Sequence, residues 1–431
     1  MLSEKQLPSI MILSLYDMPT LHFSSVTGVC SFIVNSDLCK NTRKVLSLKE
    51  FRPENMLTYR RLFIFILLMT AFASGSVAKD KSVKFAYDVD FEMNFDNREL
   101  YKSAFSRSMT IFGARVTPSV GLSIAQPEAG ADHKVMIGVD VMKDFGGRTD
   151  RLLNEVTLYY RLQKDFGETD MTMYAGIFPR KKTSGEYSPA FFSDSLTFYD
   201  SNLEGLMLQF KRPKAHFEVA CDWMGQYGND SRERFMIFSS GEGRLASMLS
   251  LGYSAYMYHY ANSDRHKGVV DNILINPYLR FDFGHMMNMQ KFSMRFGWLQ
   301  GLQNDREHAS GYVFPGGGEF DLEVRNWNVG ILNRMYYGTD LMPYYNSKDN
   351  TGTKYGPSLY MGDPFYRVYD NGTTGPGLYD RLEVFYEPDI KGSSKYLNIR
   401  LAAIFHFNGQ KYCGTQQMVQ LKFNLQELLV R

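Results

Sequence analysis

Residues 83–96, VKFAYDVDFEMNFD, decide the fold of this chain. Their apolar side chains fall on every second position, and the positions between them are polar with the single exception of Ala86. A period of two predicts a strand with one apolar face and one wet face. A strand of a soluble sheet is usually about five or six residues long, whereas crossing a bilayer at a tilt takes about 9 to 11 residues. This strand is long enough to cross a membrane.

The same alternation recurs near the end of the chain. In residues 397–408 the odd positions are apolar and the even ones include Asn398 and Arg400. In residues 415–426 apolar side chains from Val419 to Leu425 alternate with Gln, Lys and Asn. Long amphipathic strands that repeat in this way predict an all-β protein, a transmembrane antiparallel β-barrel.

The alternation, together with turn signals, predicts about 16 strands, within a range of 14 to 18. Two of these strand assignments have an alternative interpretation. Residues 233–239 are short for a strand, and the break at Asn326 rests on a phase switch that a β-bulge would also produce. The predicted strands are residues 83–96, 109–125, 133–144, 153–164, 170–179, 202–211, 214–227, 233–239, 246–260, 270–283, 289–301, 319–325, 327–337, 378–388, 396–408 and 415–426.

The lengths of the connections support this register. Outer-membrane barrels have short periplasmic turns and long extracellular loops, and both termini of an even-stranded barrel face the periplasm. Counted from the first strand, the even-numbered connections are brief, whereas odd-numbered ones include the long residues 180–201, 302–318 and 338–377. A wrong strand count would disturb this alternation.

Composition excludes other classes of protein. The 431 residues contain no run of about 18 apolar residues, so a helical membrane protein is excluded. The formal charge of +2 gives no reason to expect nucleic acid as a partner. Aromatic residues make up 15% of the chain, which fits the aromatic girdles of a barrel. The open alternative is a large soluble β-protein with an aromatic core.

The start of the chain does not belong to the predicted barrel. Residues 56–78, MLTYRRLFIFILLMTAFASGSVA, read as a signal peptide, with basic residues at Arg60 and Arg61 and a cut after Ala78. We therefore expect residues 1–55 to be an upstream over-read that is disordered, and residues 79–431 to form the mature barrel. A cytoplasmic extension before an uncleaved anchor is the alternative. The signal predicts a location in the outer membrane of a Gram-negative bacterium.

Motifs for chemistry are few. The chain has no phosphate-binding glycine motif, its histidines lack the pairing of a zinc site, and no cofactor or metal is expected. Isolated His259, His285 and His406 are expected to be lumen or interface residues. Ser254 and His259 are five residues apart on one predicted strand and thus on opposite faces. Two cysteines of the mature region, Cys221 and Cys413, make no disulfide framework.

The wet face of the strands carries charges of both signs. Such charges facing one lumen predict a water-filled channel with a transverse field. An ion-pair network filling the interior is the alternative, but a barrel of about 16 strands is too wide for side chains to fill. The candidate lumen-facing residues are Asp88, Asp90, Glu92, Glu155, Arg161, Arg280, Asp282, Arg381, Glu383, Arg400 and Lys422.

The long connection of residues 338–377 is rich in aromatic side chains. Exposed aromatics are costly unless they pack or bind something. They would serve either to stack on sugar rings or to fold the loop into the mouth of the barrel, and the structural use is favoured. The aromatic candidates are Tyr344, Tyr345, Tyr355, Tyr360, Phe365 and Tyr366.

Three blocks carry a family resemblance: YAGIFPR at residues 174–180, NLEGLMLQF at residues 202–210 and YMGDPFYR at residues 360–367. With the signal peptide and the amphipathic strands, the chain resembles porin-like outer-membrane barrels of Bacteroidetes. The resemblance implies a channel and no catalytic residues. One departure is that the chain ends on Arg431, whereas many such barrels end on an aromatic; Phe423 is the nearest candidate for that role.

The leading hypothesis is therefore a porin-like channel, not an enzyme, for passive or weakly selective passage of small hydrophilic solutes. The second is a surface-binding protein whose barrel anchors the aromatic loop, with glycan as a ligand. The third is an outer-membrane lipid hydrolase, because a catalytic constellation can be assembled from distant strands. The expected partners are outer-membrane lipid, the barrel assembly machinery and a small hydrophilic solute, with a homo-oligomer left open.

Overall fold

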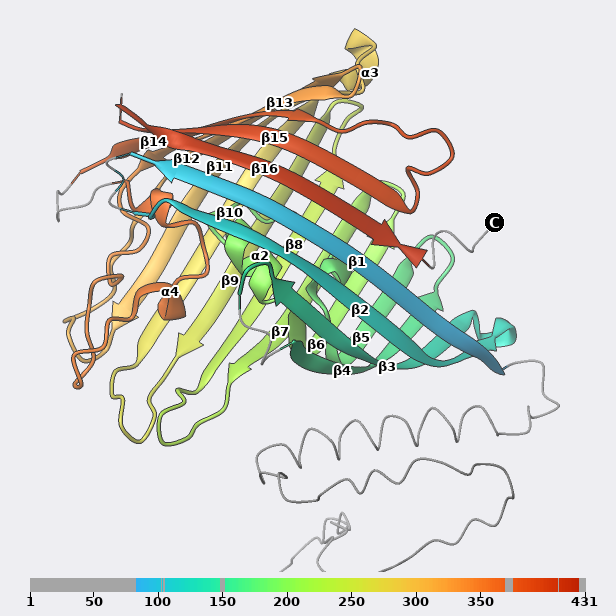
Figure 1. The fold of residues 1–431 in the computed structure, drawn as a ribbon, viewed down its shortest axis with the longest axis horizontal. Helices are drawn as coiled ribbons and strands as arrows, with labels where there is room; N and C mark the ends of the chain where they lie inside the picture. Colours follow the sequence, from blue (N-terminus) through green and yellow to red (C-terminus); the bar gives the residue numbers. More distant parts are fainter. Residues whose placement is uncertain are drawn as a thin grey trace, which may run out of the picture. The chain divides into compact units, whose positions relative to one another are not determined.

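The computed structural model describes residues 83–101, 103, 105–147, 152–368, 375–409 and 411–425. In these residues sixteen β-strands close into one antiparallel barrel, in which each strand pairs with its sequence neighbours and β1 pairs with β16 (Figure 1). The expected 16-stranded barrel is thus confirmed. The predicted signal peptide and the residues before it lie outside the described residues.

The strands end within a few residues of the predicted bounds. They are β1 (Val83–Leu100), β2 (Met109–Gln126), β3 (Ala131–Asp144), β4 (Leu153–Asp165), β5 (Asp170–Pro179), β6 (Asn202–Arg212), β7 (Ala215–Gly225), β8 (Arg234–Arg244), β9 (Leu249–Tyr260), β10 (Val270–Asp282), β11 (Lys291–Asp305), β12 (Gly316–Asn326), β13 (Val329–Gly338), β14 (Gly377–Tyr386), β15 (Leu397–Asn408) and β16 (Lys411–Asn424). In the described part of the chain, helices are short, and none has the length and apolar character needed to span a membrane.

Strand β1 shows why the alternation produces this fold. Its polar residues Asp88, Asn94 and Asp96 are buried in the interior, whereas Phe85 on the other face is 60% exposed. The outward Phe95 meets Phe112 of β2 edge to face, with ring centroids 5.3 Å apart. The apolar face is therefore the outer surface, and the polar face points inward, as lipid around a barrel requires.

The break near Asn326 is a turn and not a bulge. Trp327 and Asn328 have φ angles of 49° and 67°, and Asn326 pairs with Val329 across them. Two successive positive φ values are the conformation of a two-residue hairpin turn that matches the twist of the strands. This settles the parity of the strand count in favour of 16.

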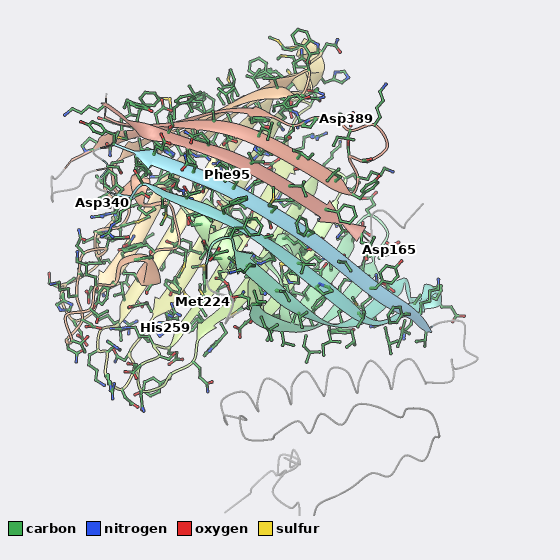
Figure 2. All side chains as sticks on the ribbon, viewed as in Figure 1. Phe95, Asp165, Met224, His259, Asp340 and Asp389 are labelled. Atoms are coloured by element: carbon green, nitrogen blue, oxygen red, sulfur yellow. The ribbon has the colours of Figure 1, made fainter. Side chains whose placement is uncertain are left out.

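The two ends of the barrel differ in their connections. Figure 2 shows Asp165, the last residue of β4, and Asp389 of the β14–β15 connection at one end, and Asp340 of the β13–β14 connection toward the other. By the rule for termini and loop lengths, the end with Asp340 is the extracellular one.

Two extracellular connections are packed against the inward side chains of the barrel. We call residues 180–201 the first inward segment; it contains η2 (Arg180–Lys182) and α2 (Asp194–Tyr199). We call residues 339–368 the second inward segment; it contains α4 (Gly356–Leu359) and η3 (Pro364–Arg367). The barrel interior is thus occupied largely by its own loops.

The aromatic residues of the second inward segment are mostly buried. Tyr355, Tyr360, Phe365 and Tyr366 are buried in the core, while Tyr344 and Tyr345 pack against it partly exposed. Strand side chains also donate hydrogen bonds to this segment, among them Tyr258 Oη to the carbonyl of Ser358 at 2.8 Å. The four buried rings are therefore not available as a platform for sugar at the surface.

The barrel wall has a gap where β5 and β6 end early. Strand β4 pairs with β5 only from Leu158 onward, so residues 153–157 have no partner strand on that side. Strand β7 pairs with β6 only up to Asp222, although β7 continues to Gly225. Because these strand ends are extracellular, the gap lies in the outer half of the barrel.

Local sequence explains why the β5–β6 hairpin leaves the wall. Pro179 ends β5 without a backbone N–H to continue the ladder, and the chain enters η2 at once. Three residues earlier, Gly176 has a φ of 117°, and a Cβ there would lie 2.2 Å from the carbonyl oxygen of Leu158. Only glycine fits this close approach.

Candidate active site

The gap in the wall opens into a cavity of about 390 Å³. Its lining combines carboxylates from the strand ends with apolar residues of both inward segments. The lining residues are Glu155, Leu196, Asp200, Asn202, Glu204, Asp222, Trp223, Met224, Arg234, Pro357, Ser358 and Met361.

Trp223 marks the depth of the gap in the membrane. Its side chain is 43% exposed on the outer surface, and its ring stacks on Phe235 with centroids 5.4 Å apart. Tryptophan on the lipid face of a barrel belongs to the aromatic girdle at the interface between headgroups and acyl chains. The gap therefore lies where the polar and apolar parts of an outer-leaflet lipid meet.

Two carboxyl groups lie side by side in the gap. Glu155 projects from the unpaired stretch of β4, and Glu204 near the start of β6 lies within hydrogen-bonding reach of it. Asn202 donates a hydrogen bond from Nδ2 to Oε2 of Glu155 at 2.7 Å, which fixes the orientation of that carboxyl. Paired carboxyls of this kind can perform general acid and base catalysis.

Asp140 is the centre of a buried network that supports this pair of carboxyl groups. It is fully buried and forms an ion pair with Arg115, whose Nε lies 2.9 Å from Oδ1. Its Oδ2 accepts hydrogen bonds from Ser201 Oγ at 2.8 Å and from Asn202 Nδ2 at 3.3 Å. Through Asn202, this buried network connects strands β2 and β3 to the position of Glu155.

Arg180 fixes the point where the first inward segment leaves and rejoins the wall. Its Nη2 lies 2.9 Å from Asp200, at the end of the first inward segment, and 3.0 Å from Asp222 of β7. Arg234 is the one cation that lines the gap cavity in the described residues, and its Nη2 donates to the carbonyl of Met224 at 2.8 Å.

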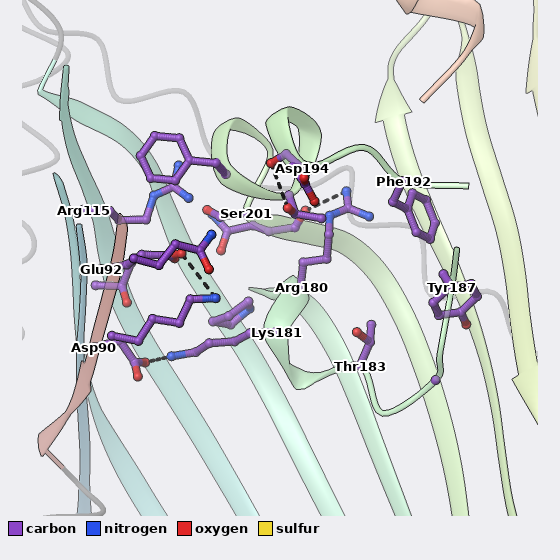
Figure 3. Close-up of a pocket in the computed structure, with 18 of the residues that line it drawn as sticks. Asp90, Glu92, Arg115, Arg180, Lys181, Thr183, Tyr187, Phe192, Asp194 and Ser201 are labelled. Atoms are coloured by element: carbon purple, nitrogen blue, oxygen red, sulfur yellow. Dashed lines mark hydrogen bonds and ion pairs between the residues drawn. The ribbon is translucent and has the colours of Figure 1, made fainter. Parts of the chain in front are cut away.

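A second cavity, of about 470 Å³, lies on the lumen side of the first inward segment. Figure 3 shows Lys181 reaching Asp90 on one side of it and the rings of Tyr187 and Phe192 on the other. Glu92 and Lys422, 3.4 Å apart, also line it. We call this cavity the lumen chamber.

The charged residues predicted to face the lumen form ion pairs. Four of them contact the first inward segment: Asp88 contacts Lys182, Asp90 contacts Lys181, Arg280 contacts Glu186 and Arg381 contacts Asp194. The others have partners within the wall: Arg161 pairs with Asp132, Asp282 with Lys291, Glu92 with Lys422 and Arg400 with Glu383, and Glu155 accepts a hydrogen bond from Asn202. Strand number alone does not reveal inward segments of this kind.

The gap brings together residues that sequence reasoning did not select, apart from Glu155. Asp200, Asn202, Glu204 and Asp222 were missed, since each reads as an ordinary polar residue at a strand end. One signal was present: Glu204 lies between Leu203 and Leu206 in the block NLEGLMLQF, where the alternation of β6 is interrupted. A carboxylate on the outer face of a membrane strand is expensive, and therefore marks function.

Among the described residues, the structure holds no Ser–His–Asp relay. Ser254 is buried inside, and its strand places His259 on the other face, as expected. His266 Nδ1 lies 2.8 Å from Asp349 Oδ2 and 3.3 Å from Thr351 Oγ1, so both neighbours share one ring nitrogen. The Thr351 hydroxyl also donates to Asp349 at 2.7 Å, which leaves it no proton for the histidine.

This Asp349 cluster has a structural role. Burial alone would raise the pKa of the Asp349 carboxyl, but hydrogen bonds from Thr351, Arg232 and His266 hold that pKa well below its usual value. The cluster therefore locks extracellular loops together. No group of three His, Cys, Asp or Glu side chains suited to a metal ion occurs in the parts of the chain that the structure describes, and both Cys221 and Cys413 there are free thiols.

The fold and the gap define an outer-membrane β-barrel of a Gram-negative bacterium. Residues 77–298 match the model of a family described as lipid A 3'-O-deacylase-type. The matched region is more than half of the 431 residues, and the chain belongs to this family. A comparison with curated proteins found no match.

Solved barrels also resemble the chain. OccD3 (OpdP) of Pseudomonas aeruginosa is 9% identical, with a TM-score of 0.42 over 82% of this chain and 97% of that one. OprD of the same organism is 13% identical, with a TM-score of 0.42 over 81% and 98%. OmpT of Vibrio cholerae lacking loop L8 is 9% identical, with a TM-score of 0.47 over 80% and 100%.

Family membership corrects the functional expectation. A passive, porin-like channel for small solutes and the absence of enzymatic activity were expected, and both expectations are wrong, because the family is that of a lipid-hydrolysing enzyme. The error has a physical source: an alternating strand pattern reports which face meets lipid, and it is the same for a channel and for an enzyme built on a barrel.

Proposed function

We propose that the protein is an outer-membrane hydrolase that removes an ester-linked acyl chain from lipid A, and that the gap is its active site. The observation that carries the proposal is the pair Glu155 and Glu204 in a gap of the wall at the level of Trp223. An acyl ester of an outer-leaflet lipid lies at this boundary between sugar and hydrocarbon. The family match supports the substrate.

The open strand edges also support a polar occupant. Residues 153–157 of β4 and residues 223–225 of β7 present backbone groups to the gap that no neighbouring strand pairs. Hydrocarbon cannot satisfy such groups, and each unsatisfied one is costly in a bilayer. A sugar headgroup offers hydroxyl and amide groups for these edges, while its acyl chains remain against the outer wall.

The two carboxyls divide the reaction between them. Glu155, held by Asn202, takes a proton from water as the water oxygen attacks the ester carbonyl. The bond between the carbonyl carbon and the sugar oxygen then breaks, and Glu204 gives its proton to that oxygen. The products are a free fatty acid and a sugar hydroxyl, and proton exchange with water resets both carboxyls. Arg234 supplies positive charge near the oxyanion.

Purified barrel in detergent micelles provides the test. Lipid A with and without phosphate is offered as substrate, and mass spectrometry follows the loss of one acyl chain. Glu155→Gln should lower the rate by about 10²- to 10⁴-fold, which is the usual contribution of a general base. Glu128→Gln, an exposed residue in η1 (Pro127–Ala129) of a periplasmic turn, is the matched control. Folded barrel that releases no fatty acid from either lipid overturns the proposal.

A further inference from the structure

The charges of the gap cavity are unbalanced. Four carboxyl groups line it, from Glu155, Asp200, Glu204 and Asp222, against the single cation Arg234. Arg180 lies behind the lining and pairs with two of them, Asp200 and Asp222. With Glu204 protonated, as its proposed role as the acid requires, three carboxylates face two arginines, so one negative charge remains in excess.

From this imbalance we infer that the lipid A cleaved at the gap lacks phosphate next to the scissile ester. The inference rests on the proposed function and specifies its substrate. A phosphate group beside several carboxylates is repelled by them. The repulsion is strong in a site that partly excludes water, because charges of like sign are only weakly screened there. Sugar hydroxyls and amide N–H groups instead donate hydrogen bonds to carboxylates.

The distribution of cations elsewhere strengthens this inference. Lys181 and Lys422 line the lumen chamber and not the gap, and both are already paired with carboxylates of β1. Arg115 is turned to the buried Asp140. In the described residues, the gap cavity thus contains no lysine that could receive a phosphate at the reacting sugar.

A place in a reaction sequence follows. If lipid A starts with phosphate on the sugar that bears the ester, a phosphomonoester hydrolysis must precede deacylation at this site. The phosphate-free lipid is then the substrate, and its deacylated form is the product.

The experiment compares two lipid A substrates that differ only in the phosphate on the sugar bearing the scissile ester. We expect kcat/KM to be at least about tenfold higher for the phosphate-free lipid. Asp200→Asn should narrow this preference by about threefold, because it removes one of the repelling charges. Asp200 is 42% exposed in its side chain, so the substitution leaves the buried network in place.

Asp230→Asn is the matched control, since Asp230 is 65% exposed on an extracellular loop outside the gap lining. It should leave the preference unchanged. Equal kcat/KM for the two lipids, or an equal effect of the two Asn variants, overturns the inference while leaving the proposed deacylation intact.

A binding measurement separates the two claims if neither lipid is hydrolysed. In a Glu155→Gln protein that also carries Trp298→Phe and Trp327→Phe, Trp223 is the remaining tryptophan of the mature chain and reports on the gap. Tighter binding of the phosphate-free lipid then supports the charge selection although the hydrolase proposal has failed. Equal binding of both lipids, or binding of neither, overturns the selection.

Discussion

The two inward segments pack against the barrel in different ways. The first, residues 180–201, is held by hydrogen bonds and ion pairs: the buried Glu218 accepts from the N–H of Ser184 at 2.6 Å and from Tyr187 Oη at 3.0 Å. The second, residues 339–368, also accepts hydrogen bonds from the wall, but it carries four buried aromatic rings, of which Phe365 stacks on Tyr379 with centroids 5.0 Å apart. Both segments border the gap, and the rings of the second, aromatic segment also form part of the buried core, whereas the first is called the polar segment.

Each kind of contact suits a different task in the barrel. Ring packing buries apolar area and contributes stability without direction, whereas hydrogen bonds to charged groups fix positions. An active site requires side chains held in defined positions, whereas a barrel wide enough to enclose loops requires contacts that stabilise the fold. Substitutions in the two segments and in the wall distinguish these two roles.

Truncation of the aromatic segment should have the largest effect. Phe365 is 3% exposed and packs against Tyr379 and His406. Phe365→Ala should lower the free energy of unfolding by about 3 to 5 kcal/mol, through lost transfer energy and the cavity left behind. Urea unfolding in detergent, followed by heat modifiability on gels, measures it. Phe314→Ala, at a site 65% exposed, is the control and should change little.

The next largest effect should be a pH dependence of stability that arises from Asp340 in the aromatic segment. Burial raises the pKa of Asp340 to about 6, partly offset by the backbone N–H of Met342 and by Arg367. A pKa above the unfolded value means that the folded state binds the proton more tightly, so stability is lost as pH rises from about 4 through 6. The loss above that range is about 2 to 3 kcal/mol.

The check is the urea midpoint at pH 4 and at pH 8. The unaltered protein should be less stable at pH 8 by this amount, and Asp340→Asn should remove most of that difference. An unchanged pH dependence in the variant would mean that burial does not raise the pKa of Asp340.

Loosening the polar segment should have a smaller and more local effect. Glu218→Gln places an amide among the donors Ser184 N–H, Tyr187 Oη and Gln209 Nε2, so several of them lose an acceptor at a cost of about 1 to 3 kcal/mol. We expect faster tryptic cleavage after Arg180, Lys181 or Lys182 and an unchanged barrel unfolding midpoint. A lowered midpoint without faster cleavage would show that Glu218 supports the wall and not the segment.

The smallest effect should come from removing an ion pair that lines the lumen chamber. Lys422 and Glu92 are 3.4 Å apart, with side chains 53% and 28% exposed. Exposed pairs of this kind contribute about 0 to 1 kcal/mol, so Lys422→Gln should hardly move the unfolding midpoint, even at low salt. A loss comparable to that of Phe365→Ala would contradict the division between the two segments.

The wall of the barrel could be predicted from sequence because alternation is local. Each strand displays its own faces, and residues 83–96 alone indicate a bilayer-spanning length. The gap could not be predicted in this way. It depends on where β5 and β6 stop pairing with β4 and β7, and register between strands is set by partners that are distant in sequence.

The candidate site was only partly predictable for a related reason. Glu155 was selected because it alternates with apolar neighbours, but Glu204 interrupts the alternation and was passed over. The role of Asn202 and Asp140 is visible only in the folded barrel, where their side chains lie 3.3 Å apart although they come from different strands. No sequence pattern within one strand predicts such a contact.

The early end of β5 and β6 has a mechanical consequence for the whole rim. A complete barrel is a hoop that carries tension around its circumference, and widening it anywhere means stretching hydrogen bonds everywhere. A rim that is interrupted between β4 and β7 behaves as a split ring, which spreads at the split while its other joints stay at rest. The split does not reach the periplasmic end, because β5 pairs with β4 and β6 pairs with β7 as far as their periplasmic turns. Lateral entry of a bulky lipid therefore needs movement of only the two strand ends that border the split.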